Sequence, residues 1–380
     1  MPDAPPSPAL LPAGLQDLLP PEAEAEAWLI EALMGVFAAH GYERVKPPLL
    51  EFEETLLAGS GAAVAEQSFR LMDPLSGRMM ALRADTTPQI ARIAAHRLVH
   101  APRPLRLSYA GQVLRVQGSE LSPMRQLAQA GIEIIGGAAP EADAEVALVA
   151  AEALQAVGVE GFVLDVTLPT MTPALLEAAG MGGPAAAALA RALDRKDAAA
   201  VSALAAERPL LAALLPPLLE AAGPADRALA ALAAAALPPG PRAIAENAAA
   251  VVRAIQAAAP GLRVTLDPLE FRGFRYHVGV AFTIYGPGRS GELARGGRYL
   301  SLQEEPATGM TLYPDALRRV ARAAPRRPRL FLPIGADRQA AARARAEGYA
   351  TVAALSPQDD PRRLGCTHIL RGDRPVPIDC

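Results

Sequence analysis

Two apolar runs joined by a loop place the strongest constraint on the fold of this chain. Residues 110–136 read AGQVLRVQGSELSPMRQLAQAGIEIIG, which indicates two strands around a loop. Five polar side chains lie along the runs, namely Arg115, Gln117, Arg125, Gln129 and Glu133. Because buried polar groups need partners, these residues form either a hydrogen-bonded structural network or the floor of a ligand site. The residues alone leave both interpretations open.

Length and composition narrow the class of protein. A chain of 380 residues can form two or three domains with a sizeable core. Its 37 basic and 40 acidic residues give no general attraction to nucleic acid, although a local patch stays possible. The two cysteines, Cys366 and Cys380, have no metal-ligand spacing, so we expect a reducing compartment and no metal. We expect a cytoplasmic protein, because no signal peptide or membrane-spanning stretch is evident.

Hydrophobic periodicity predicts a mixture of helices and strands. Residues 22–41 show helical spacing and end at Gly41. A strand at 43–45 runs into Pro47 and Pro48, which indicates a sheet edge or an interface. A helix is expected to start near Thr87 and Pro88, as N-cap and first-turn proline. Further expected elements are a hairpin formed by SFRLMD and GRMMALRAD and the strands LRLSYAGQVLRV, GIEIIGG, FVLDVTL, RVTLD and HVGVAFTIYG.

An alanine- and leucine-rich stretch interrupts the strands between residues 169 and 260. Leucine and valine recur there at helical spacing, so we predict an inserted helical subdomain, and a low-complexity linker is the alternative. Glycine and proline pairs, including Pro216 and Pro217, are expected to separate the short helices. Beyond Arg326 strand and helix patterns alternate as in a small α/β unit. We therefore expect a core at 1–325 containing the insert, and a C-terminal unit at 326–380.

Several segments, in order, resemble the catalytic core of class II histidyl-tRNA synthetases. The resemblance rests on PAGLQDLLP, HGYERVKPPLLEFEETL, ALRADTTPQIAR, the 110–136 stretch, LEFRGFRYHVGVAF and ARGGRYLSL. It covers most of residues 10–167 and 262–320. It implies an α+β fold in which an antiparallel sheet is flanked by helices, with the HGYERVKPP segment in a dimer interface.

The resemblance breaks where a synthetase holds ATP. Arg115 matches the arginine that binds the α-phosphate, but Gln117 replaces the adenine-contacting glutamate. Pro123 and Ala128 stand where a loop arginine and a histidine are found in synthetases. Ala316 replaces the arginine of the third motif, and an alanine offers neither charge nor a hydrogen bond. Losing one such group commonly costs several kcal/mol of transition-state stabilisation.

By contrast with the ATP-contacting positions, most positions that hold histidine in a synthetase keep side chains that can make those contacts. The resemblance places Asp85, Thr87 and Gln129 at the α-amino group and Glu133 at the imidazole ring. Arg272 could bind the carboxylate bidentately. Arg275 and His277 replace an aspartate and a tyrosine of the family. The implied histidine-binding set is Asp85, Thr87, Arg115, Gln129, Glu133, Arg272, Tyr276, His277 and Tyr299. The competing interpretation is a core ion network of Asp85, Glu133 and Arg272.

The C-terminal end gives a second departure. Only about fifty-five residues follow Arg326, too few for the anticodon-binding domain of a synthetase. A kept histidine site, a dismantled ATP site and a short tail resemble the ATP phosphoribosyltransferase regulatory subunits, synthetase paralogues of histidine biosynthesis. That resemblance implies a non-catalytic, histidine-binding chain without cofactors or tRNA. It would form a homodimer within a hetero-oligomer with a short-form catalytic subunit, which needs it for activity and feedback control. The alternatives are an active histidyl-tRNA synthetase-like ligase and a scaffold with a dead pocket.

Overall fold

The computed structural model describes residues 10–118, 123–270, 276–288 and 291–378. These residues divide into two compact units. The first unit ends at Arg322 and the second begins at Ala323, whereas the sequence suggested a boundary at residue 326. No helix among the described residues is long and apolar enough to cross a membrane.

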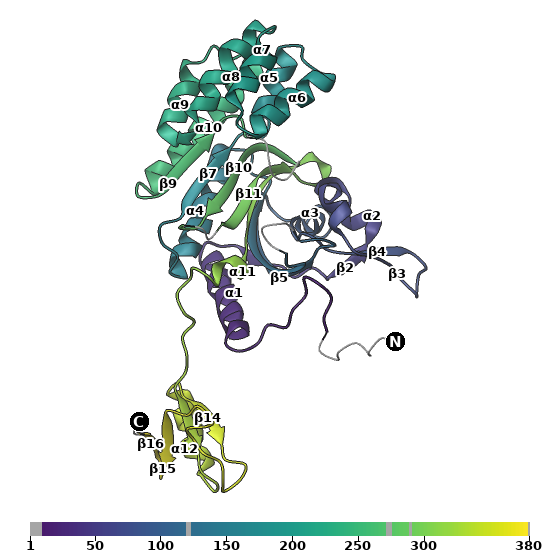
Figure 1. Ribbon diagram of the computed structural model, residues 1–380. Coiled ribbons are helices and arrows are strands. Elements are labelled where there is room, and N and C mark those ends of the chain that lie inside the picture. The colour runs from purple at the N-terminus through teal and green to yellow at the C-terminus, as the bar shows by residue number, and fades with distance from the viewer. Residues whose placement is uncertain (1–9, 119–122, 271–275, 289–290, 379–380) are drawn as a thin grey trace, which may run out of the picture. The chain divides into compact units, whose positions relative to one another are not determined.

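A nine-stranded sheet organises the first unit, in the order β1-β5-β6-β12-β11-β10-β7-β9-β8 (Figure 1). The β1–β5 and β7–β9 pairs are parallel and the other pairs are antiparallel. The strands are β1 (Glu43–Arg44), β5 (Leu105–Leu114), β6 (Gln126–Ile135), β7 (Val163–Thr167), β8 (Gly223–Pro224), β9 (Arg263–Asp267), β10 (His277–Tyr285), β11 (Glu292–Leu300) and β12 (Pro306–Leu312). The predicted fold, an antiparallel sheet flanked by helices, is confirmed.

Helices cover both faces of this sheet. The described helices of this unit are α1 (Glu22–Ala39), α2 (Glu53–Leu56), α3 (Thr87–His96), α4 (Pro140–Ala156), α5 (Met171–Ala178), α6 (Gly183–Asp194), α7 (Ala198–Ala205), α8 (Pro209–Ala221), α9 (Ala225–Ala234), α10 (Pro239–Ala258) and α11 (Pro314–Leu317), with 3-10 segments η1 (Gly59–Gln67) and η2 (Leu302–Glu304). The α1 helix ends just before Gly41, whose φ of 77° suits a residue that follows a helix C-terminus, as predicted.

The alternation of β6 separates the apolar core from the candidate site. Ala130, Ile132 and Ile134 point to one face, where they join a buried apolar cluster with side chains of α1, α4 and α10. Gln129 and Glu133 occupy the alternate positions and therefore point to the other face. There α3 packs on the sheet through a second apolar cluster. Because β6 is buried on both faces, its polar side chains must find partners within the protein.

The region between residues 169 and 260 is helical, as predicted, and forms α5 to α10 (Figure 1). The prediction that Pro216 and Pro217 break a helix is wrong, since both lie inside α8. Leu214, Leu215 and Leu218 around them are buried in the main apolar cluster. Burial of these leucines offsets the lost backbone hydrogen bonds, so tertiary packing overrides the local preference.

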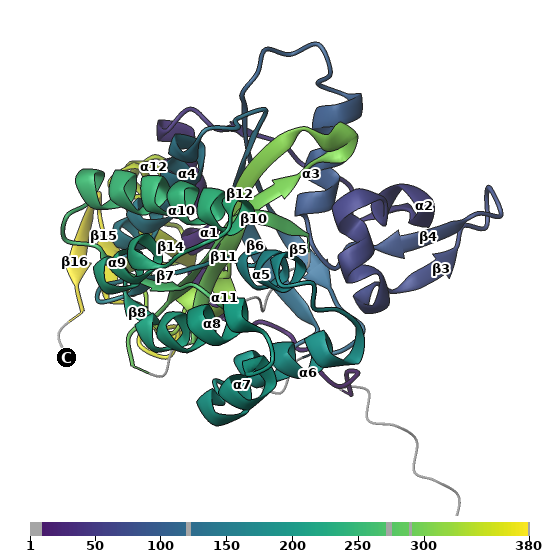
Figure 2. The same cartoon turned by 90° about the horizontal axis from the view of Figure 1, so that it is seen from above.

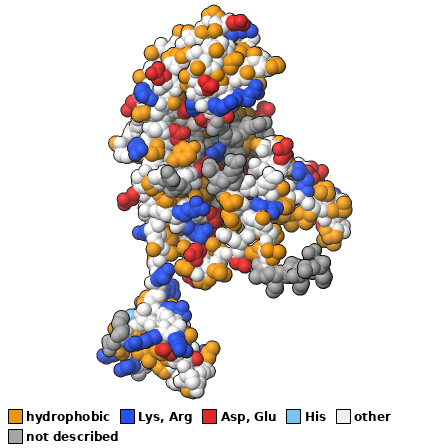
Figure 3. All heavy atoms as spheres, viewed as in Figure 1, with side chains coloured by type: hydrophobic (Ala, Val, Ile, Leu, Met, Phe, Trp, Pro, Cys, Tyr) orange, Lys and Arg blue, Asp and Glu red, His pale blue; other side chains and the backbone are white. Residues whose placement is uncertain are grey.

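A small three-stranded sheet, β2-β4-β3, extends from the same unit (Figures 1 and 2). It is built from β2 (Leu50–Phe52), β3 (Arg70–Met72) and β4 (Met79–Leu82), and the last two form the predicted hairpin. Apolar side chains gather on the hairpin surface (Figure 3), where Met72 is 65% and Leu75 95% exposed.

The second unit has its own sheet, in the order β14-β13-β15-β16. Its elements are β13 (Arg329–Leu332), α12 (Arg338–Ala346), β14 (Ala350–Ala353), β15 (His368–Arg371) and β16 (Arg374–Pro377). The α12 helix packs on one face of this sheet through Ala340, Ala341 and Ala344. The alternation of strand and helix predicted from the sequence is confirmed.

Two local differences from the sequence-based expectation concern the site. The N-cap of α3 is Thr86, which makes no side-chain capping bond, so the prediction of Thr87 as N-cap is wrong. Thr87 lies inside the helix and its hydroxyl points to Glu133 instead. The strand β12 was not predicted, although it lies in the centre of the sheet beside β6.

Candidate functional site

Glu133 lies at the centre of the candidate site and is 1% exposed. Thr87 donates a hydrogen bond to its Oε1 at 2.9 Å, and Tyr299 donates one to its Oε2 at 3.0 Å. Burial raises the pKa of Glu133 to about 8, while these two hydrogen bonds act in the opposite direction. No described residue forms a salt bridge with this carboxyl group. Glu133 is therefore mostly protonated at neutral pH in the empty site.

Glycine provides the space for this carboxyl group. Gly309 is the cross-strand partner of Glu133 on β12. A Cβ atom at Gly309 would lie 1.8 Å from Glu133 Oε2. Similarly, a Cβ atom at Gly131 would lie 2.5 Å from the Tyr109 hydroxyl group. The two glycines thus leave room for the side chains of Glu133 and Tyr109 against the sheet.

Asp85 and Gln129 form a second polar group beside α3. Asp85 is 2% exposed, and its Oδ1 accepts bonds from Gln129 Nε2 at 3.0 Å and from the Thr86 backbone at 2.9 Å. Gln129 Oε1 accepts from the Thr86 hydroxyl group at 2.8 Å. The other carboxyl oxygen of Asp85, Oδ2, is buried without a hydrogen-bond partner. An unsatisfied buried oxygen costs about 1–3 kcal/mol or more, which a ligand donor would recover.

The Asp85 loop is held in place by a buried arginine that the sequence analysis did not single out. Arg83 donates to the Gln112 carbonyl at 2.8 Å, to the Pro47 carbonyl at 3.3 Å and to Gln89 at 3.2 Å. It therefore ties β5 and α3 to the segment that follows the edge strand β1. The Pro47 and Pro48 carbonyls thus accept from Arg83 and Gln89, which fixes this segment against α3.

Three aromatic rings and a second arginine complete the cavity around Glu133. Tyr276 packs edge-on against His277 and Tyr299, with ring centroids 4.9 and 5.9 Å apart. His277 is 7% exposed, and burial, with a smaller contribution from the charge of Arg295, lowers its pKa to about 3. His277 is therefore neutral. Arg295 lines the same cavity as Thr87 and Glu133 but was not predicted.

Arg115 is a further predicted site residue. It donates to the Ala84 carbonyl at 3.3 Å, so it lies beside the Asp85 loop. Like Asp85 and Gln129, it is not among the described residues that line the cavity around Glu133. Arg272 and Arg275 lie outside the described residues. Between described residues, neither Asp85 nor Glu133 has a cationic partner. The ion-network interpretation depends on Arg272, which lies outside the described residues, so it stays an alternative.

Ala128 does not face this site, although the family resemblance matches it to a histidine of the synthetases. It alternates with Gln129 on β6 and shares a face with its cross-strand partner Gln112, which donates to Glu26 of α1. Ala316 packs against the main apolar cluster. The residue at position 128 points away from the candidate ligand, so its identity says nothing about a phosphate contact.

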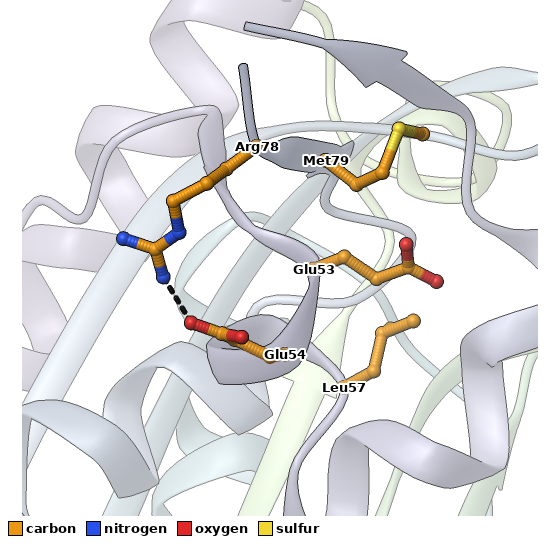
Figure 4. Close-up of a pocket in the computed structure, with 5 residues that line it drawn as sticks. All are labelled: Glu53, Glu54, Leu57, Arg78 and Met79. Carbon is orange, nitrogen blue, oxygen red and sulfur yellow. Dashed lines mark hydrogen bonds and ion pairs between the residues drawn. The ribbon is translucent and has the colours of Figure 1, made fainter. Parts of the chain in front are cut away.

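A second pocket lies at the surface, beside the β3–β4 hairpin (Figure 4). It is lined by Glu53, Glu54, Leu57, Arg78 and Met79. Its carboxylates are exposed or half-buried and already paired, Glu54 with Arg78 and Glu53 with Arg70. Across the described residues, no cluster of histidine, cysteine or carboxylate side chains could hold a metal ion. The buried groups around Glu133 and Asp85 therefore form the better candidate site.

The site can bind a small cationic or zwitterionic molecule with a hydrogen-bonding ring. Asp85 Oδ2 is an acceptor for a ligand N–H group, and the tyrosine rings suit a planar side chain.

Comparison with known sequences gives long matches. Residues 14–317 match the histidyl-tRNA synthetase family. The ATP phosphoribosyltransferase regulatory subunit of Paramagnetospirillum magneticum is 51% identical over 376 residues, covering 98% of each chain. The protein of the same name from Rhodospirillum centenum is also 51% identical and covers 97% of this chain and 96% of its own length.

Solved structures support the fold. A protein from Bacillus halodurans, described as an ATP phosphoribosyltransferase regulatory subunit/histidyl-tRNA synthetase, superimposes with a TM-score of 0.81 at 24% identity and covers 95% of this chain and 97% of its own. Histidyl-tRNA synthetase from Nostoc sp. PCC 7120 gives a TM-score of 0.77 at 18% identity, covering 95% and 90%. The class II synthetase-like fold predicted from the sequence is confirmed.

Proposed function

Because this chain belongs to the family of ATP phosphoribosyltransferase regulatory subunits, we propose that it regulates that transferase, which carries out the first step of histidine biosynthesis. In this proposal the chain does no chemistry itself. It binds histidine, and a short-form catalytic subunit requires it for activity and for feedback inhibition. The names of the relatives support the regulatory role.

The unpartnered Oδ2 of Asp85 is the observation that most favours a histidine site. The α-ammonium group of histidine would donate to this oxygen, with Gln129 beside it. The imidazole ring would lie against Tyr276, His277 and Tyr299 and donate an N–H to Glu133. Both carboxyl groups are buried, so each contact would form away from competing water.

We further propose a homodimer within a hetero-oligomer, without tRNA, in the cytoplasm. The resemblance assigns the dimer interface to the region of α1 and β1, and β1 is the edge strand of the large sheet. In the unit after Arg322 the structure describes one helix, α12, of 9 residues, which offers little surface for contacts with an anticodon. The proposed compartment follows from the biosynthetic role of the relatives.

Histidine would act by shifting a conformational equilibrium. Allostery requires two sites and a state change that each ligand biases differently. With histidine on this chain and the reaction on its partner, histidine can inhibit only by favouring an assembly state in which the partner works poorly. The subunits should therefore remain associated while turnover falls. A coupling free energy of about 1–3 kcal/mol is the usual scale.

The test is activity of the purified complex with and without histidine. We expect Asp85→Ala to raise the histidine concentration for half-inhibition by roughly tenfold or more, because it removes the ammonium contact. Activation by complex formation should persist. Asp226→Ala is the matched control, since Asp226 is an exposed carboxylate that contacts Gln256 outside the site.

Two results would contradict the proposal. One is loss of activation as well as inhibition in folded Asp85→Ala protein. The other is equal inhibition of the catalytic subunit in the absence of this chain. Histidine-dependent ATP–pyrophosphate exchange by the pure chain would favour the ligase alternative instead.

A further inference from the structure

A short loop carries two residues of the candidate site, Asp85 and Thr87. It runs from Arg83, the residue after β4, to Gln89 in the first turn of α3. A buried hydrogen bond joins the two ends of the loop, since Arg83 Nη1 donates to Gln89 Oε1 at 3.2 Å. Arg83 is 6% exposed and Gln89 is 0% exposed, so water does not compete for this bond. The two site residues thus lie in a loop that is closed at its base.

The side-chain amide of Gln89 connects this loop to a different part of the chain. Its Nε2 donates to the Pro48 carbonyl at 2.8 Å and to Glu51 Oε1 at 2.9 Å, which uses both of its N–H groups. Glu51 belongs to β2 and also accepts from Arg92 of α3 at 2.8 Å. We call Arg83, Gln89 and Glu51 the clamp. The clamp ties the loop of the candidate site to β2 and to the segment before it.

The clamp opposes a tendency of the loop to open. Asp85 is buried, and its Oδ2 has no hydrogen-bond partner. An unsatisfied buried oxygen costs free energy, which the loop would recover by turning Asp85 toward water. The hydrogen bonds at the base of the loop therefore hold Asp85 in the buried position where a ligand can use this oxygen.

We propose that Gln89 is a positioning residue: through the clamp it holds Asp85 in this pose and so sets the affinity for the ligand ammonium group without touching the ligand. This inference rests on the proposed histidine site. It extends the determinants of histidine affinity to β2, because Glu51 forms the outer end of the clamp. In metal sites, replacing a residue that only orients a ligand costs roughly 10- to 100-fold in affinity, which sets the scale for this effect.

The experiment is a double-mutant cycle measured by titration with L-histidine, by calorimetry or, for weak affinities, by ligand-observed NMR. Gln89→Met keeps the length of the side chain but removes its hydrogen bonds, so histidine affinity should fall by roughly tenfold. Because Gln89 acts through Asp85, the same change in an Asp85→Ala chain should lower the affinity by less than about a further threefold. A general loss of structure would instead lower the affinity equally in both backgrounds.

Gln112→Met is the matched control. The side chain of Gln112 donates to Glu26 of α1, and the substitution keeps the backbone carbonyl that accepts from Arg83. Histidine affinity should stay within about threefold of the wild-type value.

Glu51→Gln tests the outer end of the clamp and serves in place of Gln89→Met if that variant does not fold. It keeps the size of the side chain but removes the charge that orients the amide of Gln89. Histidine affinity should fall by roughly fivefold in the wild-type background and by less than about twofold in Asp85→Ala.

Two results would overturn the inference. One is unchanged histidine affinity in folded Gln89→Met protein, and the other is an equal loss in the wild-type and Asp85→Ala backgrounds. Failure of the proposed histidine site looks different: the wild-type chain would not bind histidine, or Asp85→Ala would bind it normally.

Discussion

Two buried carboxyl groups, Glu133 on the large sheet and Asp143 on the helix α4 that packs against it, have opposite surroundings. Asp143 of α4 is 0% exposed, and Arg298 of β11 donates to both of its oxygens at 3.0 Å. Arg298 also donates to the carbonyls of Gly137 and Ala139, just before α4 begins. Glu133 is about equally buried, but its hydrogen-bond partners among the described residues are the hydroxyl groups of Thr87 and Tyr299. Burial raises the pKa of both carboxyl groups, and only at Asp143 does an arginine offset it.

The difference distinguishes a structural network from a binding site. Arg298 supplies the counter-charge of Asp143 and completes its hydrogen bonds, so nothing further is needed there. Around Glu133 and Asp85 the described residues supply no counter-charge, and one oxygen of Asp85 has no partner. Carboxyl groups that have no ion-pair partner among the described residues are suited to a ligand that brings a cation. The following changes test this distinction.

The largest expected effect is on stability, from Asp143→Ala. This change leaves the guanidinium group of Arg298 buried without its carboxylate, at a cost of about 3–5 kcal/mol in the free energy of unfolding. Urea denaturation measures it. Adding Arg298→Met to the variant should restore part of the loss. If Asp143→Ala cost less than about 1 kcal/mol, the pair would not be the structural network described above.

A smaller effect concerns the pH dependence of stability. The pKa of Glu133 is about 8 in the folded protein and 4.5 in the unfolded reference, so the folded state binds the proton more tightly. The resulting stability is fully present below pH 4.5 and is lost as pH rises toward 8.

Glu133→Gln removes this titration. Between pH 5 and pH 7.5, the wild-type chain should lose about 3 kcal/mol of stability relative to Glu133→Gln. Urea denaturation at both pH values, without histidine, checks the sign. A difference that stayed constant over this range would show that Glu133 does not titrate there.

The smallest effect is expected from Tyr299→Phe. Removing the hydroxyl group deletes one of the two described donors to Glu133 while keeping the ring that packs against Tyr276. Histidine affinity should fall by about 0.5–1.5 kcal/mol, and the fold should be retained. Tyr285→Phe, at a residue that is 42% exposed, is the matched control. Calorimetric titration that gave equal losses for both variants would remove Tyr299 from the site.

The strands with long apolar runs could be predicted from the sequence, whereas β12 could not. The run PATGMTL contains proline, glycine and threonines, and its strand character comes from pairing with β6 and β11. The prolines of α8 show the same limit, since burial of the neighbouring leucines decides the local structure.

The site was predicted in part. The resemblance named Thr87, Glu133 and Tyr299, and the structure brings them into hydrogen-bond contact. Strand alternation alone would have placed Ala128 on the opposite face from Gln129. Arg295 was missed because its position is set by cross-strand register, which the local sequence does not reveal.

The glycine at position 309 has a genetic consequence. An alanine codon differs from a glycine codon by a single base, and the added methyl group would fall where the Glu133 carboxyl group now lies. Under the proposed function, the altered chain would fold and still assemble with its catalytic partner but would no longer register histidine. A strain selected for overproduction of histidine could therefore reach an insensitive transferase in one mutational step, without a change in the catalytic chain.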